Sequence, residues 1–503
     1  MSESRELHRL ARGGLGGLLA SVITGLGGLA FITIAARAFP KADVGVVFTV
    51  TSLFLIALAV VTLGSDIGLV RFVAMRSEEA DSDHVAGVLV ATLAPVVVIS
   101  VGAAAGLWFL LPLLGDGPLV QLARLFALFL PFGAVSNLVL AATRGLGTVR
   151  PTVLVESLLR QGLQPLLALL VALRSDDVLW LGLAWVTPYA VSSVAGTVAF
   201  RRLCRQRGVA AWVSPRSPAV VGVRRELWAF NGPRAVTQIA QIGIRRADIP
   251  IVAALAGPSA AAVYTAASRF VAAGLQGIKG IQQMVGPQIA RLVAADRIPS
   301  ASLALRTATT WNVVIAWPLY LVCAVAPGLV LLLFGRDYES GTPVVVILAL
   351  GMLIGTAAGP VDIALLMLGR SAQSLVNNMT ALVTNLLLNL TLVPVVGITG
   401  AALAWSVAIV VSNALPTWQI RPILGSAADR HTALAAGLAV AAFAVPPLLA
   451  RLAGVDSLTA QAVLVVLGGL VYLALLHTCR RPLRLPELAG AVRRRRGRQP
   501  QAT

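Results

Sequence analysis

Five polar side chains with a regular spacing stand out in an otherwise apolar stretch of the chain, residues 229–256. Four intervals of 4, 3, 4 and 3 residues separate Arg234, Gln238, Gln241, Arg245 and Asp248. On an α-helix this spacing puts them in one stripe roughly 80° wide. Guanidinium groups donate paired hydrogen bonds to phosphate oxygens. The stripe is therefore a candidate binding surface for a phosphorylated ligand.

The next apolar stretch, residues 260–286, shows the same kind of pattern. Its polar side chains also fall on one side of a helix: Arg269, Gln276, Lys279 and Gln283. In the packing alternative, both stripes are polar seams between neighbouring helices, and Arg245 pairs with Asp248. The two stripes hold four cations and one acid, however, which favours a wet cationic cavity. The candidate substrate-binding residues are Arg234, Arg245, Arg269, Lys279, Gln238, Gln241 and Gln276.

Three acids in apolar surroundings are candidates for ion coupling: Asp66, Asp248 and Asp362. A carboxylate at membrane depth is costly and often binds a proton or a cation. A position near the membrane surface is the alternative for Asp66 and Asp362. Glu156 and Arg160 form an i,i+4 pair, for which a self-satisfied ion pair and a functional role are equally supported.

Motifs for catalysis are missing from the sequence. It contains no P-loop, no Gly-x-Ser-x-Gly and no His/Cys metal cluster, and its three cysteines are scattered. We therefore expect a protein that is not an enzyme, without cofactor or metal.

The elements that carry these residues are predicted to be membrane helices. The chain is 57% hydrophobic and 12% charged, against roughly a quarter charged residues in soluble proteins. Apolar runs of about 20 residues can cross a bilayer as helices. Fourteen such runs are predicted: 13–36, 44–70, 85–113, 118–141, 151–173, 178–200, 229–256, 260–286, 305–334, 342–368, 372–394, 397–419, 431–453 and 457–477.

The distribution of basic residues predicts the topology. The two termini and the even-numbered loops hold 27 of the 40 Lys and Arg residues, whereas the odd-numbered loops hold five. Basic residues mark cytoplasmic loops, so both termini are expected in the cytoplasm. The basic C-terminal tail fits anionic lipid better than nucleic acid.

Two similar sequences, LAWVTPYAVS from Leu183 and LAWSVAIVVS from Leu403, lie 220 residues apart. Other segments align at offsets between 216 and 222, and Gly147 falls opposite Gly369. The pattern predicts two homologous six-helix lobes in parallel orientation, followed by two C-terminal helices. The expected parts are an N-terminal lobe (1–203), an Arg-rich cytoplasmic linker (204–228), a C-terminal lobe (229–421), helices 13 and 14 (422–480) and a basic tail (481–503).

Two stretches of the chain carry a family resemblance. AARAFPKADVGVVFTVTSLF with LGSDIGLVRFVA, and RADIPIVAALAGPSAAAVYTAASR, resemble the polysaccharide-export branch of the multidrug/oligosaccharidyl-lipid/polysaccharide exporter superfamily. Arg37, Gly45 and Gly64 stand at positions that resemble those of the same residues in the first two helices of that family. The resemblance implies a flippase in the bacterial cytoplasmic membrane. It would move undecaprenyl-pyrophosphate-linked oligosaccharide by alternating access between two lobes. Glycosyltransferases or a polymerase of polysaccharide assembly would be its partners.

Three alternatives remain open at this point. A multidrug or organic-cation antiporter of the same superfamily would need acidic cavity residues, which the arginine-rich stripe does not supply. A membrane glycosyltransferase, ligase or polymerase would need a larger extracellular loop or an acidic metal motif. A scaffold without transport activity is the third. The sequence does not identify the sugar or the energy source.

Overall fold

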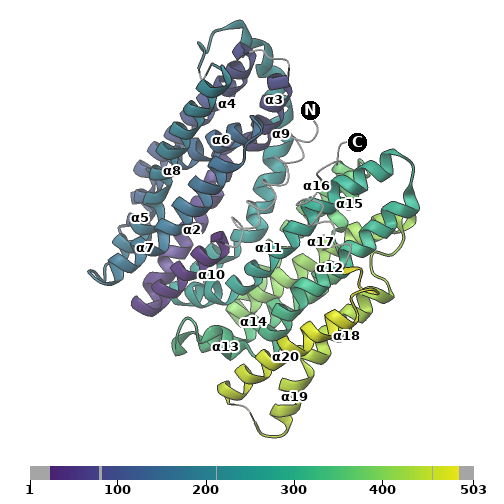
Figure 1. The fold of residues 1–503 in the computed structure, drawn as a ribbon. Helices are drawn as coiled ribbons and strands as arrows, with labels where there is room; N and C mark the ends of the chain where they lie inside the picture. The colour runs from purple at the N-terminus through teal and green to yellow at the C-terminus, as the bar shows by residue number, and fades with distance from the viewer. Residues whose placement is uncertain (1–22, 79–81, 211, 456, 486–503) are drawn as a thin grey trace. The chain divides into compact units, whose positions relative to one another are not determined.

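The computed structural model describes residues 23–78, 82–210, 212–455 and 457–485. Side chains at 77, 78 and 82 and several between 271 and 284, including those of Gln276, Lys279 and Gln283, lie outside the described part. Every regular element in the described residues is helical (Figure 1). The chain forms two compact units, and it passes from the first to the second after Ala262.

The first unit contains the helix Ile23–Ala38 and the following elements. In chain order they are α2 (Lys41–Thr62), α3 (Ser65–Glu78), α4 (Ser82–Leu110), η1 (Leu111–Leu114), α5 (Pro118–Ala127), α6 (Leu130–Gly145), η2 (Thr152–Arg160), α7 (Gln161–Ala172), α8 (Val178–Arg207), α9 (Pro218–Arg246) and α10 (Asp248–Ala256). The helix α11 (Pro258–Ala294) begins in this unit and continues into the second.

The second unit contains the C-terminal helices. They are α12 (Ile298–Val325), α13 (Pro327–Leu331), η3 (Arg336–Gly341), α14 (Thr342–Ala357), α15 (Val361–Met367), α16 (Ser371–Val396), α17 (Ile398–Leu424), α18 (Arg430–Phe443), α19 (Val445–Leu452) and α20 (Leu458–Thr478).

Ten helices in the described residues are long and apolar enough to cross a membrane, or eleven if the bent pair α5 and α6 is one span. The chain is therefore a multi-pass membrane protein. Of the other predicted spans, the first is represented by the shorter apolar helix Ile23–Ala38. The remaining two correspond to α9–α10 and α11, which carry the polar stripes. The predicted count of fourteen is not confirmed.

Two predicted spans are broken for reasons that the sequence explains. The second was expected over 44–70, but α2 ends at Thr62, and Leu63 and Gly64 have φ of 49° and 66°. The Gly-Ser-Asp sequence that follows favours this helix end and a new start at Ser65. The fourth bends by 44° between α5 and α6, where Pro131 cannot donate a helix hydrogen bond.

Glycines let α9 lie close to its neighbours in the first unit, where it packs on α2, α3 and α4. A Cβ on Gly68 would lie 1.9 Å from Asn231 Oδ1, and one on Gly87 would lie 2.7 Å from the Ala219 carbonyl oxygen. Side chains at these positions would force the helices apart. Small residues at helix contacts are typical of membrane proteins, where close packing replaces the hydrophobic effect.

The two copies of the repeated sequence occupy corresponding places in the packing. In the first unit α8, which carries Trp185, packs on α6 and α7. In the second unit α17, which carries Trp405, packs on α14 and α16. In both copies the helix that carries the tryptophan therefore packs on helices that precede it in the same unit.

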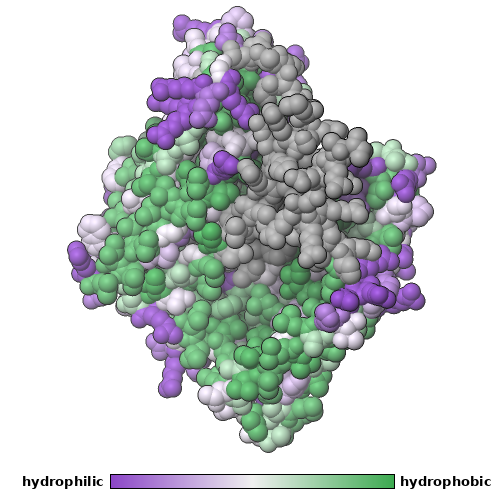
Figure 2. All heavy atoms as spheres, viewed as in Figure 1, coloured by the Kyte–Doolittle hydropathy of each residue, from purple (hydrophilic) through white to green (hydrophobic). Residues whose placement is uncertain are grey.

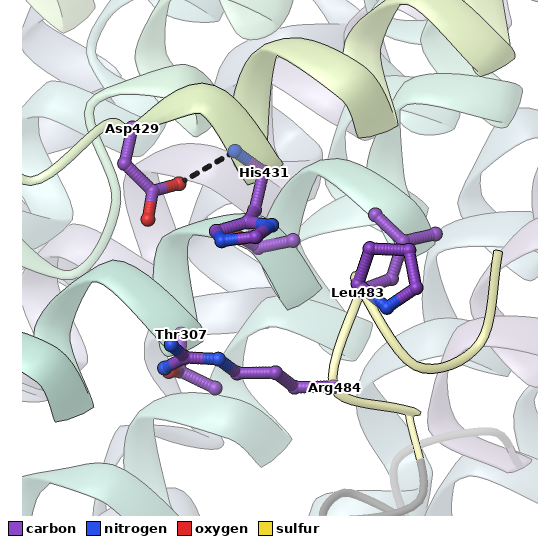
Figure 3. Close-up of a pocket in the computed structure, with 7 residues that line it drawn as sticks. Thr307, Asp429, His431, Leu483 and Arg484 are labelled. Carbon is purple, nitrogen blue, oxygen red and sulfur yellow. Dashed lines mark hydrogen bonds between the residues drawn. The ribbon is translucent and has the colours of Figure 1, made fainter.

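The end of the chain folds back onto the second unit after α20. Leu483 is fully buried near Val313 and Val314 of α12, and Arg484 Nη1 donates to Thr307 Oγ1 at 2.9 Å. Beside them Asp429 accepts the backbone N–H of His431 and caps α18 (Figure 3). The pocket between these residues has no room for a water molecule, so we assign it a packing role.

The described surface carries many exposed large apolar side chains, as a lipid-facing surface requires. In Figure 2 hydrophobic residues cover much of the visible face. Hydrophilic residues gather toward the end of the first unit where α3, α4 and α9 meet (Figures 1 and 2).

Candidate functional site

The predicted polar stripe lies on α9 as far as Arg245. Arg234, Gln238 and Gln241 are half-buried and Arg245 is exposed. Arg245 Nε donates to the Gln241 carbonyl oxygen at 3.0 Å, which leaves both terminal nitrogens of its guanidinium without a partner among the described residues. The Arg234 guanidinium also makes no hydrogen bond to a described residue. Gln238 Oε1 is buried and accepts no hydrogen bond from them.

The stripe does not run along one helix to Asp248, because the helix breaks at Ala247. Pro250 has no N–H to donate to the Arg246 carbonyl oxygen, so the helical hydrogen bonds stop here. Asp248 starts α10 instead. It is 4% exposed, and its Oδ1 accepts the backbone N–H of Ile249 at 2.9 Å.

A second charged group lies between η2 and α8 in the same unit. Arg160 Nη2 donates to Glu156 Oε1 at 3.1 Å, and Arg160 Nη1 donates to Tyr189 Oη at 3.0 Å. The guanidinium also lies over the Tyr189 ring, 4.6 Å from its centroid. The expected i,i+4 ion pair is therefore present. It sits on a π-helix, a conformation that is frequent at functional sites.

Aromatic rings surround Tyr189 on its other sides. Phe54, Trp185 and Phe126 contact one another, and Phe54 and Trp185 also contact Tyr189 at centroid distances of 5.2 and 5.4 Å. These contacts fix the ring, so the hydroxyl is held where Arg160 can reach it. The repeated tryptophan of the first copy thus supports a charged cluster.

Arg246 links this cluster to the end of α9, because it interacts electrostatically with both Asp248 and Tyr189. The four arginines Arg160, Arg234, Arg245 and Arg246 therefore divide into two classes. Arg160 forms an ion pair with Glu156, and Arg246 lies within electrostatic range of Asp248. Arg234 and Arg245 have no carboxylate beside them among the described residues, so their charge remains available to a ligand.

The other candidate cations lie on α11. Arg269 is half-buried and belongs to the second unit. The side chains of Lys279 and Gln276 are outside the described residues. Their joint action with the α9 stripe stays a prediction.

The three candidate acids have different surroundings. Asp66 lies in the first turn of α3, beyond the apolar span that ends at Thr62, and its Oδ1 is buried without a hydrogen-bond partner in the described structure. Asp362, in the first turn of α15, accepts a hydrogen bond from Ser374 Oγ at 2.6 Å. Asp248 is influenced by Arg246.

Tyr189, which belongs to the charged cluster, was not singled out from the sequence. A comparison of the two copies of the repeat could have pointed to this cluster. The repeat offset of 220 puts Ile409 opposite Tyr189, and the offset of 222 around Gly147 puts Leu382 opposite Arg160. Arg160 and Tyr189 thus stand in the first copy where the second copy has apolar residues, while Glu156 falls opposite the polar Asn378.

Metal ligation has no structural basis in the described residues, which contain no group of three His, Cys, Asp or Glu side chains that could hold an ion. The arrangement that they do contain is a set of donors. It suits a ligand with phosphate oxygens near Arg234 and Arg245, and with a hydroxyl that can donate to Gln238 Oε1.

Solved structures with the same fold are membrane transporters. The lipid II flippase MurJ in an inward closed conformation is 12% identical, with a TM-score of 0.72 over 92% of this chain and 98% of that chain. A multidrug resistance MATE family transporter in an inward-facing conformation is 15% identical, with a TM-score of 0.66 over 82% and 98%. A MOP superfamily transporter from Pyrococcus furiosus is 16% identical, with a TM-score of 0.58 over 85% and 99%.

At these identities the likenesses show the fold alone, which this chain shares with these transporters. No curated protein gives a significant sequence match. A family model described as "polysaccharide biosynthesis protein" matches residues 34–343, more than half of the chain. The chain therefore belongs to the polysaccharide biosynthesis protein family.

Proposed function

We propose that the protein is a flippase for an undecaprenyl-pyrophosphate-linked oligosaccharide, which it moves across the bacterial cytoplasmic membrane by alternating access. The observation that carries this proposal is the open charge of Arg234 and Arg245 on α9. A pyrophosphate is a dense anion that arginine binds through paired hydrogen bonds. Transport requires no catalytic residue, which agrees with a role other than that of an enzyme.

The surroundings of the two arginines support this choice of ligand. Gln238 lies one helical turn from Arg234, and no described residue donates a hydrogen bond to its buried Oε1 atom. Leaving a buried acceptor without a donor costs about 1–3 kcal/mol, so a ligand hydroxyl that donates to it gains binding energy. Sugars attached to the pyrophosphate supply such hydroxyls.

The same fold occurs in MATE transporters, so fold does not separate a lipid-linked glycan from a multidrug substrate. Charge favours the glycan. An organic cation would be repelled by Arg234 and Arg245, while the carboxylates nearby, Glu156 and Asp248, already interact with Arg160 and Arg246. An anionic head group would instead be attracted by Arg234 and Arg245.

The proposal includes the arrangement of the chain in the membrane. Both termini face the cytoplasm, and two homologous lobes, 1–203 and 229–421, are joined by the linker 204–228. Helices 13 and 14 (422–480) and the basic tail (481–503) follow. The corresponding packing of α8 and α17 supports the repeat. The enzymes that make or polymerise the glycan are its proposed partners.

Binding to the purified full-length protein tests the proposal. We expect undecaprenyl pyrophosphate to bind more tightly than undecaprenol, which has no phosphate. Each charge-assisted contact contributes about 1.5–3 kcal/mol, so Arg234→Gln and Arg245→Gln should each weaken pyrophosphate binding about 10- to 150-fold. Arg174→Gln is the matched control, because Arg174 is an exposed arginine of the same unit outside the stripe.

Two results would contradict the flippase. One is equal affinity for undecaprenol and undecaprenyl pyrophosphate in the unmodified protein. The other is tight binding of the lipophilic cation tetraphenylphosphonium that undecaprenyl pyrophosphate does not displace, which would favour the multidrug alternative.

A further inference from the structure

An open groove of about 630 Å³ lies on the first unit, between the end of α2, the middle of α4 and the beginning of α9. Its volume is in the usual range for sites that bind small molecules, roughly 300–1,000 Å³. The apolar part is formed by Leu63, Pro95, Ile99 and Val221. The polar part consists of Arg224 and Arg225, with Trp228 beside them.

From helix lengths, we expect the apolar part of the groove at the level of a membrane surface. α2 has 22 residues, which at 1.5 Å per residue span about 33 Å, close to the thickness of the hydrocarbon core. Leu63 follows directly after this helix. On α4, Ile99 in the groove is 40% exposed, and Val98 and Val101, which are close to it in the sequence, are 70% and 51% exposed. Such apolar exposure on a spanning helix indicates contact with lipid chains.

The polar part of the groove has unused hydrogen-bonding capacity. Arg224 and Arg225 are exposed, and neither makes a hydrogen bond or ion pair with another described residue. The indole N–H of Trp228 also has no described partner. No acidic side chain is among the described residues that line the groove. Trp and Arg at a membrane surface are typical contacts of lipid head groups.

The groove is separate from the proposed substrate stripe. At 100° per residue, Val221, Arg224, Arg225 and Trp228 lie between roughly 80° and 180° around α9 from Arg234. Arg245 lies within about 20° of Arg234 by the same measure. The two arginine groups of α9 therefore face different directions and can serve different ligands.

We infer that this groove binds an anionic phospholipid of the surrounding membrane. One acyl chain lies along Leu63, Pro95 and Ile99. There it contacts these apolar side chains on one side and the neighbouring lipid chains on the other. The phosphate accepts hydrogen bonds from Arg224 and Arg225, and an ester or head-group oxygen accepts the Trp228 N–H. A free phosphate would gain nothing from the apolar part, so the combination selects a lipid.

Native mass spectrometry of the full-length protein in detergent tests the inference, with phosphatidylglycerol and phosphatidylethanolamine of identical acyl chains as probes. We expect selective retention of phosphatidylglycerol. Each arginine near a membrane surface contributes about fivefold in affinity, so Arg224→Gln/Arg225→Gln should reduce retention about 25-fold. Ile99→Trp, which fills the apolar part without changing charge, should also reduce it.

The matched control is Arg201→Gln/Arg202→Gln, another adjacent pair of exposed arginines at the end of α8. It should leave retention unchanged. An equal loss of phosphatidylglycerol retention in this control would mean that the lipid is attracted by positive charge in general. That result would overturn the proposal of a binding site in the groove. So would displacement of the phospholipid by millimolar inorganic phosphate, or preferential displacement by undecaprenyl phosphate, which would assign the groove to a soluble anion or to the substrate carrier.

Discussion

Arg160 and Tyr189 join η2 to α8 by two contacts at once. The guanidinium donates a hydrogen bond to the Tyr189 hydroxyl at 3.0 Å and lies 4.6 Å from the centroid of its ring. The Arg160 side chain is 12% exposed, and the Glu156 side chain that accepts its other hydrogen bond is 39% exposed. The tyrosine therefore holds the buried side of the arginine, and the carboxylate its more open side.

This difference predicts how the cluster responds to substitution. Tyr189→Phe removes the hydroxyl and keeps the ring, and it should lower stability by about 1.5 kcal/mol because the lost hydrogen bond is to a charged group. Glu156→Gln should cost less, about 1 kcal/mol at most, because solvent screens the exposed carboxylate. Thermal unfolding of the purified protein measures both changes.

Tyr338→Phe is the control for the hydroxyl. The Tyr338 hydroxyl is buried and makes no hydrogen bond in the described structure, so its removal should not lower the unfolding temperature. If Tyr189→Phe behaves in the same way as Tyr338→Phe, the hydrogen bond from Arg160 contributes nothing to stability.

Close packing between α2 and the start of α11 gives a second prediction. A Cβ on Gly45 would lie 1.7 Å from the Pro258 carbonyl oxygen, and backbone cannot move aside as a flexible side chain can. Gly45→Ala should destabilise the protein by about 1–3 kcal/mol, the usual cost of overpacking. A Cβ on Gly102 of α4 would meet nothing within 4 Å, so Gly102→Ala should leave the unfolding temperature unchanged or raise it.

The all-helical fold could be predicted from the sequence because apolar runs of about 20 residues are a strong signal. The ends of the elements were less accessible. The run 44–70 contains a helix end at Thr62, because Gly64 permits the positive φ at which α2 stops. α9 and α11 carry several arginines and glutamines and are not among the described helices that are apolar enough to cross a membrane, so the seventh and eighth spans stay predictions.

The candidate site was predicted in part. The 4-3-4 spacing from Arg234 to Arg245 correctly placed these residues on one helix. Pro250 was the local signal that Asp248 belongs to a new helix. The contact of Arg160 with Tyr189 spans 29 residues and depends on how η2 and α8 pack, which helical periodicity within either element does not contain.

The three candidate acids should differ in any ion coupling. Asp66 Oδ1 is buried without a donor, so a proton or a cation can occupy its free electron pairs. Asp362 already has Ser374 Oγ, and Asp248 has Arg246. In proteoliposomes, Asp66→Asn should abolish the dependence of flipping on a proton or sodium gradient, whereas Asp362→Asn should retain it. The same response to gradients in Asp66→Asn as in the parent would make Asp66 a structural residue.

Reporter fusions test the predicted topology. A green fluorescent protein fused after Thr503 should fluoresce, since it folds in the cytoplasm and the positive charges of the even-numbered loops place the C-terminus there. A cysteine at position 174, in an odd-numbered loop, should react with an impermeant maleimide added outside cells after the three native cysteines have been replaced. A dark fusion together with a protected position 174 would reverse the orientation.

The shape of the cation at position 245 should matter as well as its charge. Arg245 has both terminal nitrogens available for two parallel hydrogen bonds to a phosphate, while lysine presents a single point charge. Flipping of a fluorescent undecaprenyl-pyrophosphate oligosaccharide in proteoliposomes should therefore fall about 10- to 150-fold in Arg245→Gln, if one charge-assisted contact is lost. It should fall less in Arg245→Lys and not at all in Arg174→Gln. Equal rates in Arg245→Gln and the parent would remove Arg245 from the binding site, and equal rates in the Lys and Gln variants would mean that only the two-pronged contact counts.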